Sequence, residues 1–141
     1  MTSYSYRAHL TWLWVVSFVL VIMGVLYLRV IVRIGPDASS TLFDLVLAQY
    51  VPYLGAIVAF HFAARTARQP ATKGQIVPYR VAMLLSLLWN LTVVVFVVQA
   101  CSNPDLTEDA TADIKKFVPP LSWAVAPAIG FFFGKPAEEK K

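Results

Sequence analysis

The sequence contains little charge, and none of it lies near the middle of a long apolar segment. Of its 141 residues, 14% are charged and 58% are hydrophobic, whereas a soluble domain has about 25% charged and about 45–50% apolar residues. Proton-coupled pumps and small four-helix drug exporters need a buried acid whose protonation competes with substrate binding. The absence of such an acid therefore argues against both classes.

Cysteine, histidine and catalytic motifs are also scarce. Cys101 is the single cysteine, so the chain cannot form an internal disulfide, and the two histidines, His9 and His61, are far apart in the sequence. No cluster has metal-ligand spacing, and there is no glycine-rich phosphate loop, nucleophile elbow or His-Glu-x-x-His motif. We therefore expect no metal, no cofactor and no enzymatic activity.

What the sequence does contain is four long apolar segments. About 20 apolar residues are needed for a helix to cross the hydrocarbon core of a bilayer. The predicted spans are 10–34, 43–64, 80–100 and 117–134, separated by polar loops at 65–79 and 102–116 and followed by a charged tail at 135–141. The first segment is longer than the 7–15 apolar residues of a signal peptide. The fold class is therefore predicted as an all-α integral membrane four-helix bundle, formed by a single transmembrane domain over 1–141.

Prolines and capping residues predict where the spans begin and bend. Thr41, with Asp44 three residues later, has the spacing of a capping box for the second span. Pro52 predicts a kink inside that span. Pro119-Pro120 fit the first turn of the fourth span, where proline is tolerated, and Pro127 predicts a bend deeper within it. In the polar segment before that span, Thr107-Glu108-Asp109 could open a short surface helix.

The distribution of charge predicts the orientation. The loop 65–79 is basic and has no acid, whereas the loop 102–116 begins with several acids. The positive-inside rule places the basic loop and both termini in the cytoplasm and the acidic loop outside, which predicts a multi-pass membrane protein. Aromatic residues fit the belts of the two interfaces: Trp12, Trp14, Tyr79 and Phe131-Phe132-Phe133 lie at the cytoplasmic ends, and Tyr27, Tyr50, Tyr53 and Trp123 lie toward the outer ends.

Two rows of small residues, each with a four-residue step, indicate close helix packing. The rows are Gly55, Ala59 and Ala63 in the second span, and Ser122, Ala126, Gly130 and Gly134 in the fourth. Small residues at this spacing let helix backbones approach one another. The rows are expected either to pack within one bundle or to form an interface between copies of the chain.

Two polar side chains inside the spans are candidates for lining a pore. Gln49 and Asn90 each have two interpretations, a hydrogen bond between helices or part of a polar pathway. His61 lies 12 residues from Gln49, about 120° away around the helix. We therefore interpret His61 as a packing or interfacial residue rather than as part of a proton relay.

The basic residues Arg65, Arg68, Lys73 and Arg80 have three candidate roles. They set the topology and contact anionic lipid headgroups, or bind a cytoplasmic anion such as a nucleotide or oligonucleotide, or dock a regulatory protein with an acidic face. The composition alone does not distinguish among these three roles.

Short motifs add a resemblance. The turn Ala64-Arg65-Thr66-Ala67-Arg68 follows the second span, and the short last span ends in Gly130-Phe131-Phe132-Phe133-Gly134. With the chain length and the four spans, this layout resembles small four-helix membrane effectors of bacterial anti-phage defence, both RexB-like phage-exclusion channels and nucleotide-regulated channels. The resemblance implies an oligomeric pore that depolarises the inner membrane when released from inhibition. It assigns no role to an individual residue.

The sequence therefore supports two functional hypotheses. The first is a homo-oligomeric membrane pore or ion channel, gated from the cytoplasm by an anionic ligand or a partner protein, with an acidic outer mouth that concentrates cations. The alternative is a non-catalytic accessory or assembly subunit of a larger membrane complex. Self-association without other subunits favours the first hypothesis, and a monomer that co-purifies with a larger partner favours the second.

Overall fold

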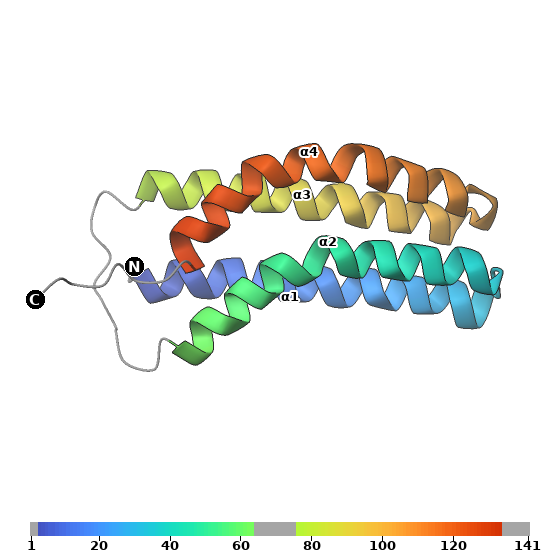
Figure 1. Cartoon of the computed structure of the whole chain (residues 1–141), viewed down its shortest axis with the longest axis horizontal. Coiled ribbons are helices and arrows are strands. Elements are labelled where there is room, and N and C mark those ends of the chain that lie inside the picture. Colours follow the sequence, from blue (N-terminus) through green and yellow to red (C-terminus); the bar gives the residue numbers. More distant parts are fainter. Residues whose placement is uncertain (1–2, 64–75, 134–141) are drawn as a thin grey trace, which may run out of the picture.

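The computed structural model describes residues 3–63 and 76–133, with the side chains of 6–61 and 77–133 among them. These residues form an all-α structure (Figure 1). Its long helices are α1 (Ser3–Tyr27), α2 (Pro36–Ala63), α3 (Ile76–Ser102) and α4 (Thr107–Phe133). A π-helical turn, η1 (Leu28–Val32), extends α1, and a 3-10 turn, η3 (Pro104–Leu106), precedes α4.

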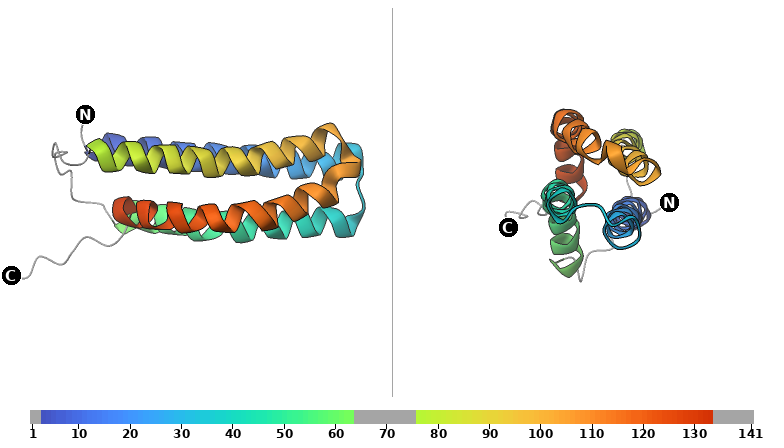
Figure 2. Two further views of the ribbon diagram at one scale, coloured as in Figure 1. Left: turned by 90° about the horizontal axis from the view of Figure 1, so that it is seen from above. Right: turned by 90° about the vertical axis from the view of Figure 1, so that its right-hand side faces the viewer.

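The helices form an elongated bundle in two layers, with α1 and α3 in one layer and α2 and α4 in the other (Figure 2). Helix α1 packs against the antiparallel α2 and the parallel α3, and α4 packs against the antiparallel α3 and the parallel α2. Helices α2 and α3 therefore lie at opposite corners. We call the end with the two short connections, 33–35 and 103–106, the hairpin end, and the opposite end the terminal end.

All four helices are long and apolar enough to cross a membrane. The candidate spans contain 27, 26, 26 and 30 residues, and at a rise of 1.5 Å per residue each exceeds the roughly 30 Å hydrocarbon core. Large apolar side chains such as Leu20, Leu84 and Trp123 are exposed on the outer surface. This surface suits lipid as its solvent, so the bundle has the features of a multi-pass membrane protein.

Helix α2 begins earlier than the predicted capping box. Its first residue is Pro36, where a missing amide hydrogen costs nothing, and the amide of Ser39 donates to the carbonyl of Gly35 over 3.1 Å. The chain before it turns at Arg33, which has a left-handed conformation with φ of 62°. Thr41 consequently lies in the second turn of α2 and does not cap it, because the helix has already begun at Pro36.

Helix α4 also begins earlier than the predicted fourth span. The hydroxyl of Thr107 donates to the carbonyl of Pro104 over 2.6 Å, which ties η3 to the start of the helix. Ala110, Ile114 and Val118 are buried at four-residue steps, so this polar segment covers the bundle with one apolar face. The segment 102–116, predicted as a loop with a short surface helix opening at Thr107, is helical from Thr107 onward, and this helix continues into the fourth span.

Prolines bend the two helices of one layer. Pro52 lies inside α2, and Pro119, Pro120 and Pro127 lie inside α4. Both helices change direction about halfway along (Figure 1), as expected where proline removes a backbone hydrogen bond. The sequence predicted bends in both spans. It placed Pro119-Pro120 in a first turn, whereas they lie inside α4 because the helix starts at Thr107.

The parallel helices α1 and α3 pack closely at Gly24. A Cβ atom added there would lie 2.7 Å from Cγ1 of Val97. The thiol of Cys101 donates to the Gly24 carbonyl over 3.5 Å. A small residue is therefore required at this position, which belongs to neither of the predicted small-residue rows.

Gly24→Ala should destabilise the bundle by about 1–3 kcal/mol, because the stiff β-branched Val97 cannot move away cheaply. Thermal unfolding in detergent micelles measures this. The same change should cost less in a Val97→Ala background. Gly55→Ala is the matched control, since a Cβ there meets nothing within 4 Å. Equal melting temperatures for Gly24→Ala and Gly55→Ala would show that the α1–α3 contact does not need glycine.

Candidate functional site at the centre of the bundle

Four aromatic side chains from three helices fill the centre of the bundle. Trp14 of α1, Tyr50 and Tyr53 of α2 and Trp89 of α3 form what we call the aromatic cluster. The ring centroid of Trp14 lies 4.8 Å from that of Trp89 and 4.7 Å from that of Tyr53, and Tyr50 lies 4.9 Å from Trp89. These are contact distances for aromatic rings. At the level of the aromatic cluster, these side chains fill the interior of a single bundle.

The sequence did not predict this cluster. Trp14, Tyr50 and Tyr53 were assigned to the interfacial belts, but all are buried and meet each other. They are drawn inward because α1 and α2 pack as antiparallel neighbours, which brings the first half of one beside the middle of the other. The available signal was that Trp14 and Leu10, four residues apart, share one helix face.

Ser122 connects the fourth helix to the aromatic cluster. The indole nitrogen Nε1 of Trp89 donates to the Ser122 hydroxyl over 2.9 Å, and the Tyr53 hydroxyl donates to the Ser122 carbonyl oxygen over 3.3 Å. The Ser122 hydroxyl in turn donates to the Val118 carbonyl over 3.1 Å. An unpaired polar group is costly where there is no water. One residue of α4 therefore satisfies two polar groups of the cluster.

Five buried polar atoms have no hydrogen-bond partner among the described residues. One is Arg7 Nε at the terminal end, and the other four lie on the residues of the cluster or near it: Trp14 Nε1, Tyr50 Oη, Ser86 Oγ and Asn90 Oδ1. Ser86 and Asn90 lie within one turn of Trp89 on α3, and the Asn90 amide nitrogen donates to the Ser86 carbonyl over 2.7 Å. The four atoms supply hydrogen-bond donors and acceptors suited to a small neutral molecule such as water. They contain no acid–base pair.

The structure separates the two predicted pore-lining residues. Asn90 is 1% exposed, within α3, whereas Gln49 is half-buried in α2. Among the described residues no hydrogen bond joins the two side chains, and Gln49 is not one of the buried unpaired groups. Asn90 belongs to the buried polar group beside the aromatic cluster.

Of the predicted anion-binding residues, the structure describes the side chain of Arg80 alone. Arg80 is exposed in the first turns of α3, at the terminal end. Arg65, Arg68 and Lys73 lie outside the described residues. The hypothesis of a cytoplasmic anion site therefore stays a prediction.

The small-residue rows lie mainly on the outer surface. Gly55 and Ala59 of α2 and Ala126 and Gly130 of α4 are exposed, whereas Ser122 is half-buried. A Cβ added at Gly55 or Gly130 would meet nothing within 4 Å. The side chain of Ala63 and all of Gly134 lie outside the described residues. Packing within one bundle therefore does not require glycine at 55 or 130.

A second group of contacts, not predicted from the sequence, joins the helices at the terminal end. Tyr6 stacks on Tyr79 with ring centroids 4.2 Å apart. The Arg7 guanidinium lies 4.5 Å from the centre of the Phe60 ring. Nε2 of His61 is 2.9 Å from the Thr11 hydroxyl, which fits its interpretation as an interfacial residue.

Comparison with known proteins identifies no relative: no family model, no curated protein and no solved structure matches this chain. Within the described ranges, no group of three or more His, Cys, Asp or Glu side chains is placed to hold a metal ion. Functional inference therefore rests on the bundle's own geometry.

Ser122→Ala should lower stability by about 1–3 kcal/mol, because it leaves the buried Trp89 indole without an acceptor. The melting temperature in detergent measures the loss, and the tryptophan emission maximum should shift. Ser102→Ala is the control, since Ser102 is exposed at the end of α3. If both variants melt together, the Trp89–Ser122 bond does not stabilise the cluster.

Proposed function

We propose that the protein is a homo-oligomeric membrane pore whose conduction path lies between copies of the chain. The closed aromatic cluster favours this arrangement, because it leaves no route through the centre of a single bundle. The polar atoms near Asn90 face the interior of the bundle, so they cannot line a path between copies. The surface of the bundle must then supply the lining.

The observation that carries the proposal is the exposed face of α2. Asp37, Asp44, Val51 and Gly55 are all exposed, and their spacing of seven, seven and four residues places them on one side of the helix. The face is acidic toward the hairpin end and small at Gly55, where a second helix can approach closely. Carboxylates in lipid contact are costly, so assembly around a water-filled path stabilises this face.

This face supplies the parts that a cation pore needs. Rings of Asp37 and Asp44 from several copies attract cations to the mouth at the hairpin end. Below them, a ring of Val51 forms an apolar constriction, which closes a path by excluding water. Opening then requires a small change in helix spacing or tilt at that level.

The basic terminal end supplies the proposed control. The positive-inside rule places Arg80 and the loop 65–79 in the cytoplasm with both termini. A nucleotide, an oligonucleotide or a protein with an acidic face binding there would act on α2 and α3, which border that loop. The resemblance to anti-phage effectors places such a pore, as part of this proposal, in the bacterial inner membrane.

The test is oligomeric mass in nanodiscs together with cation flux from liposomes. A defined oligomer that conducts supports the pore, whereas a monomer contradicts it. Gly55→Leu should reduce the oligomeric fraction by about tenfold, because the larger side chain prevents close approach of helices. Ala124→Leu, an exposed change elsewhere on α4, should leave assembly unchanged.

Asp44→Asn should lower the ratio of cation to anion flux several-fold, because it removes one carboxylate per copy from the proposed mouth. The control is Asp109→Asn, an exposed carboxylate on α4. Reversal potentials across planar bilayers give the ratio. Selectivity that responds equally to both changes would exclude the α2 face as the lining.

A second candidate function is that of an accessory subunit in a larger membrane complex. Trp123 is 84% exposed and Trp12 is 67% exposed. Large aromatic side chains of this kind are what protein interfaces bury. A monomer that is retained by a larger membrane protein through Trp123, and lost on Trp123→Ala, would support this function instead.

A further inference from the structure

Two cavities follow the seam between the parallel helices α2 and α4. The first, of about 370 Å³, lies at the hairpin end, and its polar lining includes Asp37, Thr41, Glu108 and Lys115. The second, an open surface groove of about 390 Å³, lies further toward the terminal end, where α2 contributes Tyr53 and α4 contributes Ser122, Trp123, Ala126 and Pro127. The upper cavity is charged and the lower one mainly apolar.

One face of α4 connects the two cavities. Glu108, Lys115, Ser122 and Ala126 are spaced by seven, seven and four residues, which places them in one row along the helix. From Lys115 to Trp123 the helix rises about 12 Å. This matches one leaflet of the hydrocarbon core, which is about 15 Å deep. A membrane surface at the level of Lys115 would place Trp123 in the acyl region of the same leaflet.

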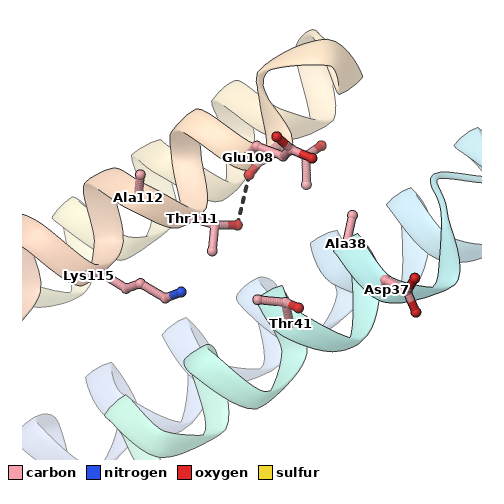
Figure 3. Close-up of a pocket in the computed structure, with 8 residues that line it drawn as sticks. Asp37, Ala38, Thr41, Glu108, Thr111, Ala112 and Lys115 are labelled. Atoms are coloured by element: carbon pink, nitrogen blue, oxygen red, sulfur yellow. Dashed lines mark hydrogen bonds between the residues drawn. The ribbon is translucent and has the colours of Figure 1, made fainter.

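The charges of the upper cavity are ordered by depth. Figure 3 shows the Lys115 side chain at the deeper end of the cavity and the carboxylates of Asp37 and Glu108 toward the hairpin end. Side chains on a helix point toward its N-terminus, which in α4 is the hairpin end, so the Lys115 ammonium extends into the cavity. A positive charge thus lies nearer the middle of the bundle, and two negative charges lie nearer its hairpin end.

A zwitterionic phospholipid has the complementary order. Its phosphate is attached to the glycerol, next to the acyl chains, and its amine is the outermost group. Placed in the seam, the phosphate meets Lys115 in a charge-assisted contact, the amine meets Asp37 and Glu108, and an acyl chain enters the lower cavity beside Ala126. An anionic lipid without an amine would instead bring its outer headgroup beside two carboxylates.

We propose that the α2–α4 seam is a binding site for a phospholipid whose headgroup carries a phosphate and a terminal amine, such as phosphatidylethanolamine. The inference does not depend on conduction: of the residues on the exposed face of α2, the seam shares Asp37 alone, and the contacts tested below at Lys115, Glu108 and Ala126 belong to α4. A protein that forms no pore can still bind this lipid, and the two proposals fail in different experiments.

The test is native mass spectrometry of the full chain, released from nanodiscs with equal amounts of phosphatidylethanolamine and phosphatidylglycerol. Lys115→Ala should reduce retained phosphatidylethanolamine about tenfold, because it removes the phosphate contact. Lys116→Ala is the matched control, because Lys116 is adjacent and exposed but does not line the cavity, and its ammonium lies 5.3 Å from the centre of the Phe117 ring. Equal retention by both variants overturns the proposal.

Two further pairs test the amine and the acyl chain. Glu108→Gln should abolish the preference for phosphatidylethanolamine over phosphatidylglycerol, whereas Asp109→Asn should keep it. Ala126→Leu should lower retention by filling the lower cavity, whereas Ala124→Leu should not. If soluble phosphoethanolamine displaces the lipid fully and Ala126→Leu has no effect, the seam recognises a free headgroup and the lipid proposal is wrong.

Discussion

The bundle depends on a constraint that lipid imposes on aromatic side chains with polar atoms. Trp89 and Tyr53 place an indole N–H and a phenol hydroxyl in the interior, where no solvent satisfies them. Ser122 accepts a hydrogen bond from each of them, over 2.9 Å and 3.3 Å. This junction fixes the height of α4 relative to α2 and α3, because moving α4 by one turn would break both bonds. The residues of α4 that meet α2 along the seam, and those that remain exposed, follow from that register.

Much of this architecture is predictable from composition and length, because a chain with four apolar segments in lipid has few alternatives to four helices. The bends of α2 and α4 are predictable too, since proline acts through its own backbone. The start of α2 and the full extent of α4 were harder to predict from the sequence. Pro36 and Thr107 begin helices inside segments that are polar, and hydropathy alone separates polar helix from loop poorly. The sequence does carry a signal for the buried face of α4, because Ala110 and Ile114 recur with a four-residue apolar period.

The contacts between helices could not be predicted from the sequence, for a different reason. Trp14 and Trp89 are 75 positions apart, and their contact depends on which helices are neighbours. An up-and-down chain of four helices allows more than one order around the bundle, and local pattern does not choose between them. Gly24 illustrates the same limit, because one glycine in an apolar span has no visible partner until Val97 is placed 2.7 Å from its missing Cβ. The sequence shows that the two rows consist of small residues, but it does not show that most of these residues are exposed.

The exposed positions divide between two surfaces with different physical requirements. On α2, Asp44 and Gly55 share a face that lipid solvates poorly at its acidic end, so a second copy and water are better neighbours there. On α4, Lys115 and Ala126 lie along the seam with α2, where opposite charges at different depths suit one amphipathic molecule. A lipid in the seam would cover Ala126 and hold α2 and α4 at a fixed spacing. Since the proposed constriction at Val51 depends on the position of α2, occupancy of the seam and closure of the path would be coupled through that one helix.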